Sequence, residues 1–193
     1  MDSTDVKGER NIAGLAALLQ GAPGRPIPPV EHWQPPYCGD IGLEIGADGT
    51  WLYRNSPIRR ESLIKLFASV LRKDADGRTY LVTPAEKVDV AVEDAPFLAV
   101  DMEVRGAGRA QELIFRTNVE DVVRCGPGHP LRFAAQVPGG GLKPYVLVRG
   151  QLEALLTRAL LYDLAALAVE ETRDERSLPG VWSGGAFFAM EAA

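Results

Sequence analysis

Residues 38–58 read CGDIGLEIGADGTWLYRNSPI, and this stretch decides how the first half of the chain folds. The dipeptide Asp48-Gly49 reaches positive φ easily and therefore favours a tight turn. Apolar and β-prone residues flank it over residues 41–46 and 50–54. The stretch therefore predicts a β-hairpin.

A helix is expected directly after this hairpin. Ser56 can accept a hydrogen bond as the N-cap, and Pro57 loses nothing in a first turn, where its missing N–H has no partner. Apolar residues follow at helical spacing: Leu63, Leu66, Phe67, Val70 and Leu71. This pattern predicts an amphipathic helix that starts at Ser56.

Outward from this region, the pattern predicts about nine strands and three helices, mostly antiparallel by connection length. Strands are expected near residues 79–83, 87–93, 98–104, 112–117, 131–137, 145–149 and 181–190, and a first helix over 11–20. Residues 151–171 are apolar around most of a helical circumference, which is typical of a buried core helix or a dimer face. The fold class predicted is α+β.

An internal duplication is also expected. Residues 51–54 lead into a helix and then a strand at 80–82, and residues 145–149 lead into a helix and a strand at 186–188. We therefore predict two similar lobes, each a mostly antiparallel sheet with one main helix. The boundaries expected are an N-terminal helix and Pro-rich connector (1–36), a first lobe (37–95) and a second lobe (96–193).

Composition excludes several classes of protein. The net charge of −5 argues against general nucleic-acid binding, which needs a basic surface. No apolar run approaches the roughly 20 residues that cross a bilayer, and the polar N-terminus lacks the apolar core of a signal peptide. These features favour a cytoplasmic protein that contacts neither nucleic acid nor membrane.

Motifs for catalysis, metals and cofactors are not found. The chain lacks Gly-x-Ser-x-Gly and a phosphate-binding loop, so no catalytic residue and no cofactor are predicted. The best metal candidates are His32, Cys38, Cys125 and His129, but their spacing is not that of a zinc site. We interpret both cysteines as inert and His129 as a turn residue whose ring caps a backbone group.

An anion site is more plausible at the predicted helix start. Free N–H groups and the helix dipole at Ser56 favour an anion, and Arg59 and Arg60 lie beside it. Arg149 precedes the second predicted helix, so the two helix starts could share one cleft. The alternative is that these arginines are solvated or pair with glutamates.

Other residues could complete such a site. Aromatic side chains that could flank a base are Tyr53, Tyr145 and Trp182. Polar side chains that could orient it are Asp40, Lys87 and Asn118. Aromatic residues in strands are, however, more often part of the core.

The chain resembles an uncharacterised proteobacterial family known only as a domain of unknown function. The matching motifs are CGDI (38–41), DGTW (48–51), SPI (56–58), LVTP (81–84), VEDAPF (92–97), TNV (117–119) and HPL (129–131). They extend over roughly residues 30 to 188 in order, which makes the match specific. The resemblance implies a duplicated fold with a C-terminal half like a pleckstrin-homology domain. It also implies a pocket between the halves for a nucleotide-like ligand and a setting in signal transduction.

The functional expectation is a non-enzymatic binding or signalling protein that holds a nucleotide-like or phosphorylated small molecule between two lobes. The first alternative is a hydrolase or transferase that uses a carboxylate such as Asp40, Glu86, Glu93 or Asp163. The second is a structural module that forms a homodimer through the Leu-rich second helix.

Overall fold

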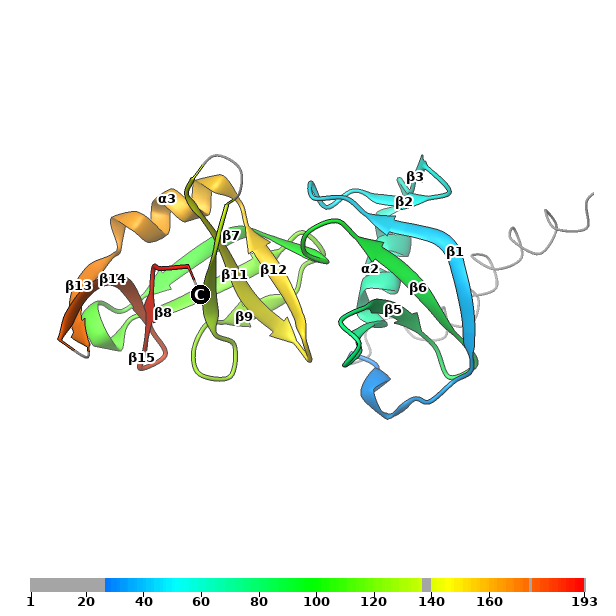
Figure 1. Cartoon of the computed structure of the whole chain (residues 1–193), viewed down its shortest axis with the longest axis horizontal. Helices are drawn as coiled ribbons and strands as arrows, with labels where there is room; N and C mark the ends of the chain where they lie inside the picture. The colour runs from blue at the N-terminus through cyan, green and yellow to red at the C-terminus, as the bar shows by residue number, and fades with distance from the viewer. Residues whose placement is uncertain (1–26, 137–139, 174, 193) are drawn as a thin grey trace, which may run out of the picture. The chain divides into compact units, whose positions relative to one another are not determined.

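The computed structural model describes residues 27–136, 140–173 and 175–192 (Figure 1). The helix expected over 11–20 lies outside these residues. The chain divides into two compact units, Met1–Asp94 and Ala95–Ala193, which we call unit 1 and unit 2.

Unit 1 contains a six-stranded sheet with one α-helix. Its elements are η1 (Val30–His32), β1 (Tyr37–Ile45), β2 (Trp51–Tyr53), β3 (Ser56–Pro57), α2 (Glu61–Ser69), β4 (Leu71–Lys73), β5 (Thr79–Val82) and β6 (Lys87–Val92). The strand order is β3-β2-β1-β6-β5-β4, and β1 and β6 pair in parallel. The sheet thus consists of two antiparallel meanders joined at one central parallel pair.

Unit 2 contains a second six-stranded sheet, one α-helix and a small three-stranded sheet. Its elements are β7 (Phe97–Arg105), η2 (Gly108–Ala110), β8 (Glu112–Thr117), β9 (Val122–Arg124), β10 (Leu131–Ala135), β11 (Leu142–Arg149), β12 (Leu152–Leu156), α3 (Arg158–Ala166), β13 (Val169–Arg173), β14 (Arg176–Ser183) and β15 (Ala186–Ala189). The large sheet has the order β10-β11-β12-β7-β8-β9, with β12 and β7 parallel. The small sheet has the order β13-β14-β15.

The two large sheets share one topology. Read in the reverse direction, the second sheet is β9-β8-β7-β12-β11-β10, so each strand of unit 2 takes the place of the unit 1 strand numbered six lower. In both sheets the first strand of one meander pairs in parallel with the last strand of the other. The predicted α+β fold with two similar, mostly antiparallel lobes is confirmed, and the likeness of unit 2 to pleckstrin-homology domains stays a prediction.

The repeat differs, however, from the one that the sequence suggested. Strand β2 corresponds to β8, and not to β11 around Tyr145. The helices also occupy different places, since α2 joins the two meanders of unit 1 whereas α3 follows the last strand of its sheet. The strand-helix-strand correspondence was therefore wrong, because it aligned two helices that are not equivalent.

The predicted β1–β2 hairpin is confirmed. Gly49 has a φ of 79°, and Asp48 Oδ1 accepts a hydrogen bond from the Thr50 N–H at 2.9 Å. The hairpin places Trp51 in the core of unit 1, where its ring lies 6.2 Å from that of Phe67 on α2. Packing of the hairpin against α2 therefore forms the centre of this core.

The predicted helix start at Ser56 is wrong. Ser56 and Pro57 form β3, which pairs with Tyr53 and Leu52 of β2. The preceding Arg54 and Asn55 have φ values of 48° and 63°, as in a tight two-residue hairpin turn. This turn returns the chain to the sheet, so α2 begins five residues later.

The predicted helix over 151–171 is also wrong. Leu152, Ala154 and Leu156 are buried at every second position in β12, which pairs with β11 and β7. Only Arg158–Ala166 is helical, and it buries Leu160 and Leu164. The apolar residues over 151–171 thus belong to a strand followed by a short helix. The long apolar helix on which the predicted dimer face was based is not formed. The described residues form fifteen strands instead of the nine expected, and two α-helices, while the third expected helix, over 11–20, lies outside them.

Candidate functional site

Strand β1 does not follow its parallel neighbour β6 evenly. From Tyr37 to Asp40 it advances three residues while β6 advances two, and from Asp40 to Leu43 it advances three while β6 advances one. Two bulges therefore lie on either side of Asp40, and β1 curves strongly along its length (Figure 1). Bulges of this kind bend a strand and interrupt its pairing.

Two glycines allow these bulges. Gly39 and Gly42 have φ values of 88° and 81°, a region that other residues adopt only with strain. A Cβ atom on Gly42 would also lie 3.1 Å from Cγ of Arg54. Asp40 Oδ1 accepts a hydrogen bond from the Gly42 N–H at 2.7 Å, which stabilises the second bulge. The CGDIG sequence is therefore a double-bulge sequence.

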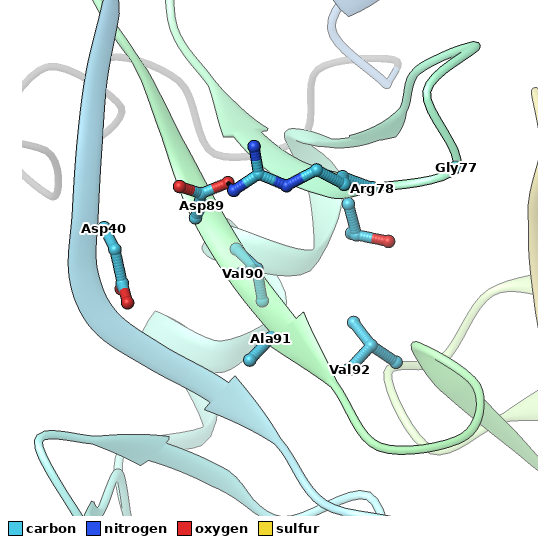
Figure 2. A pocket seen from close by; sticks show the side chains of 8 residues that line it. Asp40, Gly77, Arg78, Asp89, Val90, Ala91 and Val92 are labelled. Atoms are coloured by element: carbon cyan, nitrogen blue, oxygen red, sulfur yellow. Dashed lines mark hydrogen bonds and ion pairs between the residues drawn. The ribbon is translucent and has the colours of Figure 1, made fainter.

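A pocket of ≈ 340 Å³ opens beside the bulged part of β1. It is lined by Asp40, Gly77, Arg78, Thr79, Asp89, Val90, Ala91 and Val92 (Figure 2). Successive residues of β6 form the apolar part of its wall, and two carboxylates, one guanidinium and the hydroxyl of Thr79 form the polar part. We call it the bulge pocket.

Asp89 is the anchor of the bulge pocket. It is 8% exposed, and its carboxylate accepts hydrogen bonds from the Arg78 guanidinium and from the Tyr37 hydroxyl. Arg78 reaches it from the residue directly before β5, and the two side chains point toward each other in Figure 2. The Tyr37 oxygen and the charge of Asp89 together raise the pKa of Arg78. The arginine side chain stays about half exposed, at 55%.

A second group of polar residues joins β5 and β6 to the turn between β4 and β5. The Tyr80 hydroxyl donates to Asp76 at 2.5 Å, and this bond raises the pKa of Tyr80 to about 12. Lys87 Nζ lies 3.0 Å from Asp74 Oδ2 and 4.3 Å from the centroid of the Tyr80 ring. Lys87, predicted to orient a ligand, is therefore part of this supporting network.

Of the six predicted site residues in unit 1, one lines the bulge pocket, namely Asp40. Tyr53 lies under the guanidinium of Arg54, whose Cζ is 5.3 Å from the ring centroid. Ser56, Arg59 and Arg60 are exposed around β3 and the start of α2. The expected capped helix start with an anion site at Ser56 is not formed, because Ser56 belongs to a strand.

The predicted residues of unit 2 make contacts within its fold. Asn118 Oδ1 accepts from the Leu98 N–H at 3.0 Å, and the Asn118 N–H donates to the Leu98 carbonyl at 2.8 Å. Arg149 pairs with Asp121 at 2.5 Å, so its guanidinium neutralises a neighbouring carboxylate. These two residues join strand ends to loops.

The two predicted aromatic residues of unit 2 each lie under an arginine. Tyr145 is buried on β11, and the Arg132 Cζ is 4.1 Å from its ring centroid. Trp182 on β14 lies 5.0 Å from Arg109 Cζ and 5.5 Å from the ring of Phe187. Both rings therefore contribute to the packing of unit 2.

Sequence reasoning missed Arg78 and Asp89. Asp89 looked like a solvent-facing residue of the alternating strand over 87–93, and Arg78 like part of a turn. A usable signal was present in Gly39 and Gly42, since two glycines within four residues of a strand indicate bulges or close approach of another group.

Cys125 and His129 both have structural roles in unit 2. Cys125 is buried, and burial raises the pKa of its thiol to about 12, so it is an inert core residue. Nδ1 of His129 lies 3.0 Å from the Leu147 carbonyl oxygen, as expected for a turn histidine that caps a backbone group. Within the described residues, no three His, Cys, Asp or Glu side chains are grouped for a metal ion.

The structure thus defines a two-unit α+β protein with one sheet topology used twice and a polar pocket in its first unit. Residues 28–95 match the N-terminal domain, and residues 96–190 the C-terminal domain, of the family of unknown function DUF1285. The chain belongs to this DUF1285 family.

Two solved structures are similar to this chain. A DUF1285 family protein from Silicibacter pomeroyi DSS-3 is 44% identical, with a TM-score of 0.83 over 93% of this chain and 95% of the other. One from Shewanella baltica OS155 is 30% identical, with a TM-score of 0.49 over 63% of this chain and 88% of the other. No curated protein matches the chain. No helix in its described parts has both the length and the apolar character needed to cross a membrane.

Proposed function

We propose that this protein is a non-enzymatic, cytoplasmic binding protein whose first unit holds a small nucleotide-like molecule in the bulge pocket. The observation that carries the proposal is the double bulge of β1. It places Asp40 at the wall of a pocket of ≈ 340 Å³, a volume within the usual range of ligand pockets.

The charges of the bulge pocket select the part of the ligand that enters. Asp40 and Asp89 can only accept hydrogen bonds when ionised, and Arg78 can only donate. A nucleobase edge or a ribose diol offers N–H and O–H donors to the carboxylates and acceptors to the arginine. A phosphate group would meet two carboxylates against one guanidinium that is already paired, so it belongs outside the pocket.

A route from binding to signalling follows from the contacts of Asp89. Its carboxylate holds the hydroxyl of Tyr37, the first residue of β1. A ligand that donates to Asp89 competes with this hydroxyl and changes how firmly the start of β1 is held. Release of Tyr37 is thus the proposed signal of occupancy.

A thermal-shift screen tests the proposal with guanosine, adenosine and their 5′-monophosphates at millimolar concentration. Binding to the folded state stabilises it by about 2.7 kcal/mol at a ligand concentration 100 times Kd, so a useful affinity gives a clear rise in Tm. No rise with any of the four compounds would overturn the proposal.

Two matched pairs of variants locate the site. Ala91→Leu fills the wall of the bulge pocket and should abolish the ligand-induced shift, whereas Ala135→Leu, at an exposed strand position of unit 2, should not. Asp40→Ser removes a carboxylate whose Oδ1 accepts the N–H two residues on, and Asp48→Ser removes the same arrangement outside the pocket. If Asp40→Ser and Asp48→Ser give the same ligand response, Asp40 does not bind the ligand.

A further inference from the structure

Unit 2 has a pocket of its own, with a chemistry opposite to that of the bulge pocket. It has a volume of ≈ 480 Å³ and lies where the start of β11, the end of β12 and the first two turns of α3 meet. We call it the α3 groove. None of the ten residues predicted from the sequence lines it.

The floor of the α3 groove is aliphatic. Leu142 and Pro144 come from β11, Leu156 from the end of β12, and Leu161 from α3. Pro144 and Leu156 are buried, while Leu142 and Leu161 are half-buried. Such a surface gains free energy from covering by hydrocarbon, in proportion to the apolar area removed from water.

The rim of the α3 groove is basic. Its charged lining residues are Lys143 and Arg158, and among the lining residues that the structure describes there is no carboxylate. The chain as a whole carries a net charge of −5, whereas the described lining residues include two cationic side chains and no anionic one. Charge complementarity therefore favours an anionic occupant.

Arg158 is held in place by Tyr162, one helical turn further along α3. Its Nε and Nη2 donate to the phenol oxygen at 3.1 and 3.0 Å. Because the phenol accepts both of these bonds, its own O–H can still donate outward. The pair thus presents N–H and O–H donors at one edge of an aliphatic surface. Arg158 also opens α3, where the aligned peptide dipoles add to its positive potential.

We propose that the α3 groove binds a small anionic amphiphile, a carboxylate with a hydrocarbon tail. The carboxylate accepts from Arg158 and Tyr162, and the tail covers the aliphatic floor. This site goes beyond the proposed function, since it lies in the other unit and takes a ligand of different chemistry. The result of the nucleotide-binding test on the bulge pocket therefore neither supports nor contradicts the proposal for the α3 groove.

The experiment titrates the full-length chain, with its leucine methyl groups labelled for NMR, with decanoate below its micelle concentration. Shifts are expected at Leu142, Leu156 and Leu161, with no change at Leu43 and Leu81 in the core of unit 1. Decanol, which has the tail without the charge, should bind at least tenfold more weakly. Binding should weaken along the series decanoate, octanoate, hexanoate. The factor expected is about fourfold for each methylene removed, and each step of the series removes two.

The variant Arg158→Gln keeps a good helix former and removes the charge, so it should reduce decanoate affinity at least tenfold. Arg176→Gln is the matched control, an exposed arginine of unit 2 that pairs with Glu191 at 3.3 Å outside the groove. The proposal fails if decanoate does not bind, if decanol binds equally well, or if the two variants respond alike. Binding of anionic lipid vesicles without binding of decanoate would overturn it in favour of a membrane contact.

Discussion

The two central strand pairs, β1 with β6 and β7 with β12, occupy the same place in sheets of the same topology and differ in how evenly they pair. The β7–β12 pair runs in even register, Phe97 with Ala154, Leu98 with Leu155 and Ala99 with Leu156. The β1–β6 pair is interrupted twice around Asp40. The double bulge at Gly39 and Gly42, which places Asp40 beside the bulge pocket, is therefore a feature of the β1–β6 pair that the β7–β12 pair does not share.

The largest loss of unfolding free energy is expected where the helix of each unit packs into its core. A pair of variants tests whether each unit depends on one buried side chain of its helix. Phe67 on α2 and Leu164 on α3 are both 0% exposed. Phe67→Ala should cost about 3–5 kcal/mol and Leu164→Ala about 2–5 kcal/mol of unfolding free energy, measured by urea denaturation. Asp163→Ala, on the exposed side of α3, should stay within about 0.5 kcal/mol. A near-neutral result at Phe67 or Leu164 would show that this helix is not needed for its core.

A smaller loss of unfolding free energy is expected from a side chain in the second bulge of β1, the feature that distinguishes the β1–β6 pair from the β7–β12 pair. Gly42→Ala forces a side chain onto a backbone with a φ of 81° and toward Arg54, at a cost of about 1–3 kcal/mol. The same variant should lose ligand binding in the bulge pocket. Gly128→Ala is the control, since its added Cβ would meet nothing within 4 Å. If Gly42→Ala keeps full stability, the second bulge is not strained by a side chain as we infer.

The smallest effect concerns pH and contrasts a partly buried carboxylate of unit 1 with an exposed one of unit 2. Burial opposes ionisation of Asp74, but hydrogen bonds from Arg72 and Lys87 outweigh it and lower its pKa. The hydrogen bond from Arg116 lowers the pKa of the exposed Asp101. A carboxylate with a lowered folded pKa contributes stability above its unfolded value of about 3.9, and this contribution is lost as the pH falls through the folded value.

Urea denaturation between about pH 5 and pH 2 measures this difference. Asp74→Asn should flatten the acid loss of stability at both low and high salt. Asp101→Asn should do so only at low salt, because exposed pairs are screened. Equal salt sensitivity of the two variants would contradict the contrast.

The sequence predicted most of the strands because their signals are local. Asp48-Gly49 fixes its turn whatever surrounds it, and the alternating valines of β6 specify a half-buried strand by themselves. Ser56-Pro57 misled because a helix cap and a strand after a tight turn begin with the same residues. What decides between them is the left-handed backbone at Arg54 and Asn55, which neither residue type requires.

The remaining errors arose from contacts distant in sequence. The leucines of β12 become a strand because β11 and β7 pair with them on both sides, and the apolar residues that follow in α3 hid the short alternation of this strand. Asp40 could be selected as a site residue from its own motif. Arg78 and Asp89, which line the same pocket, could not, since the pairing of β5 with β6 brings these two side chains together.

The buried guanidinium of Arg72 sets a practical limit on how unit 1 can be cut from the chain. It is 6% exposed, and its Nη1 donates to the carbonyl oxygens of Val30 and Trp33 at 2.7 and 2.8 Å. A fragment trimmed to the first residue of the sheet, Tyr37, would keep this arginine and delete both acceptors. Nε and Nη2 of Arg72 would keep Asp74 but Nη1 would lose both acceptors, so such a fragment should be less stable although every strand is present. A fragment of unit 1 that keeps both acceptors has to include Val30.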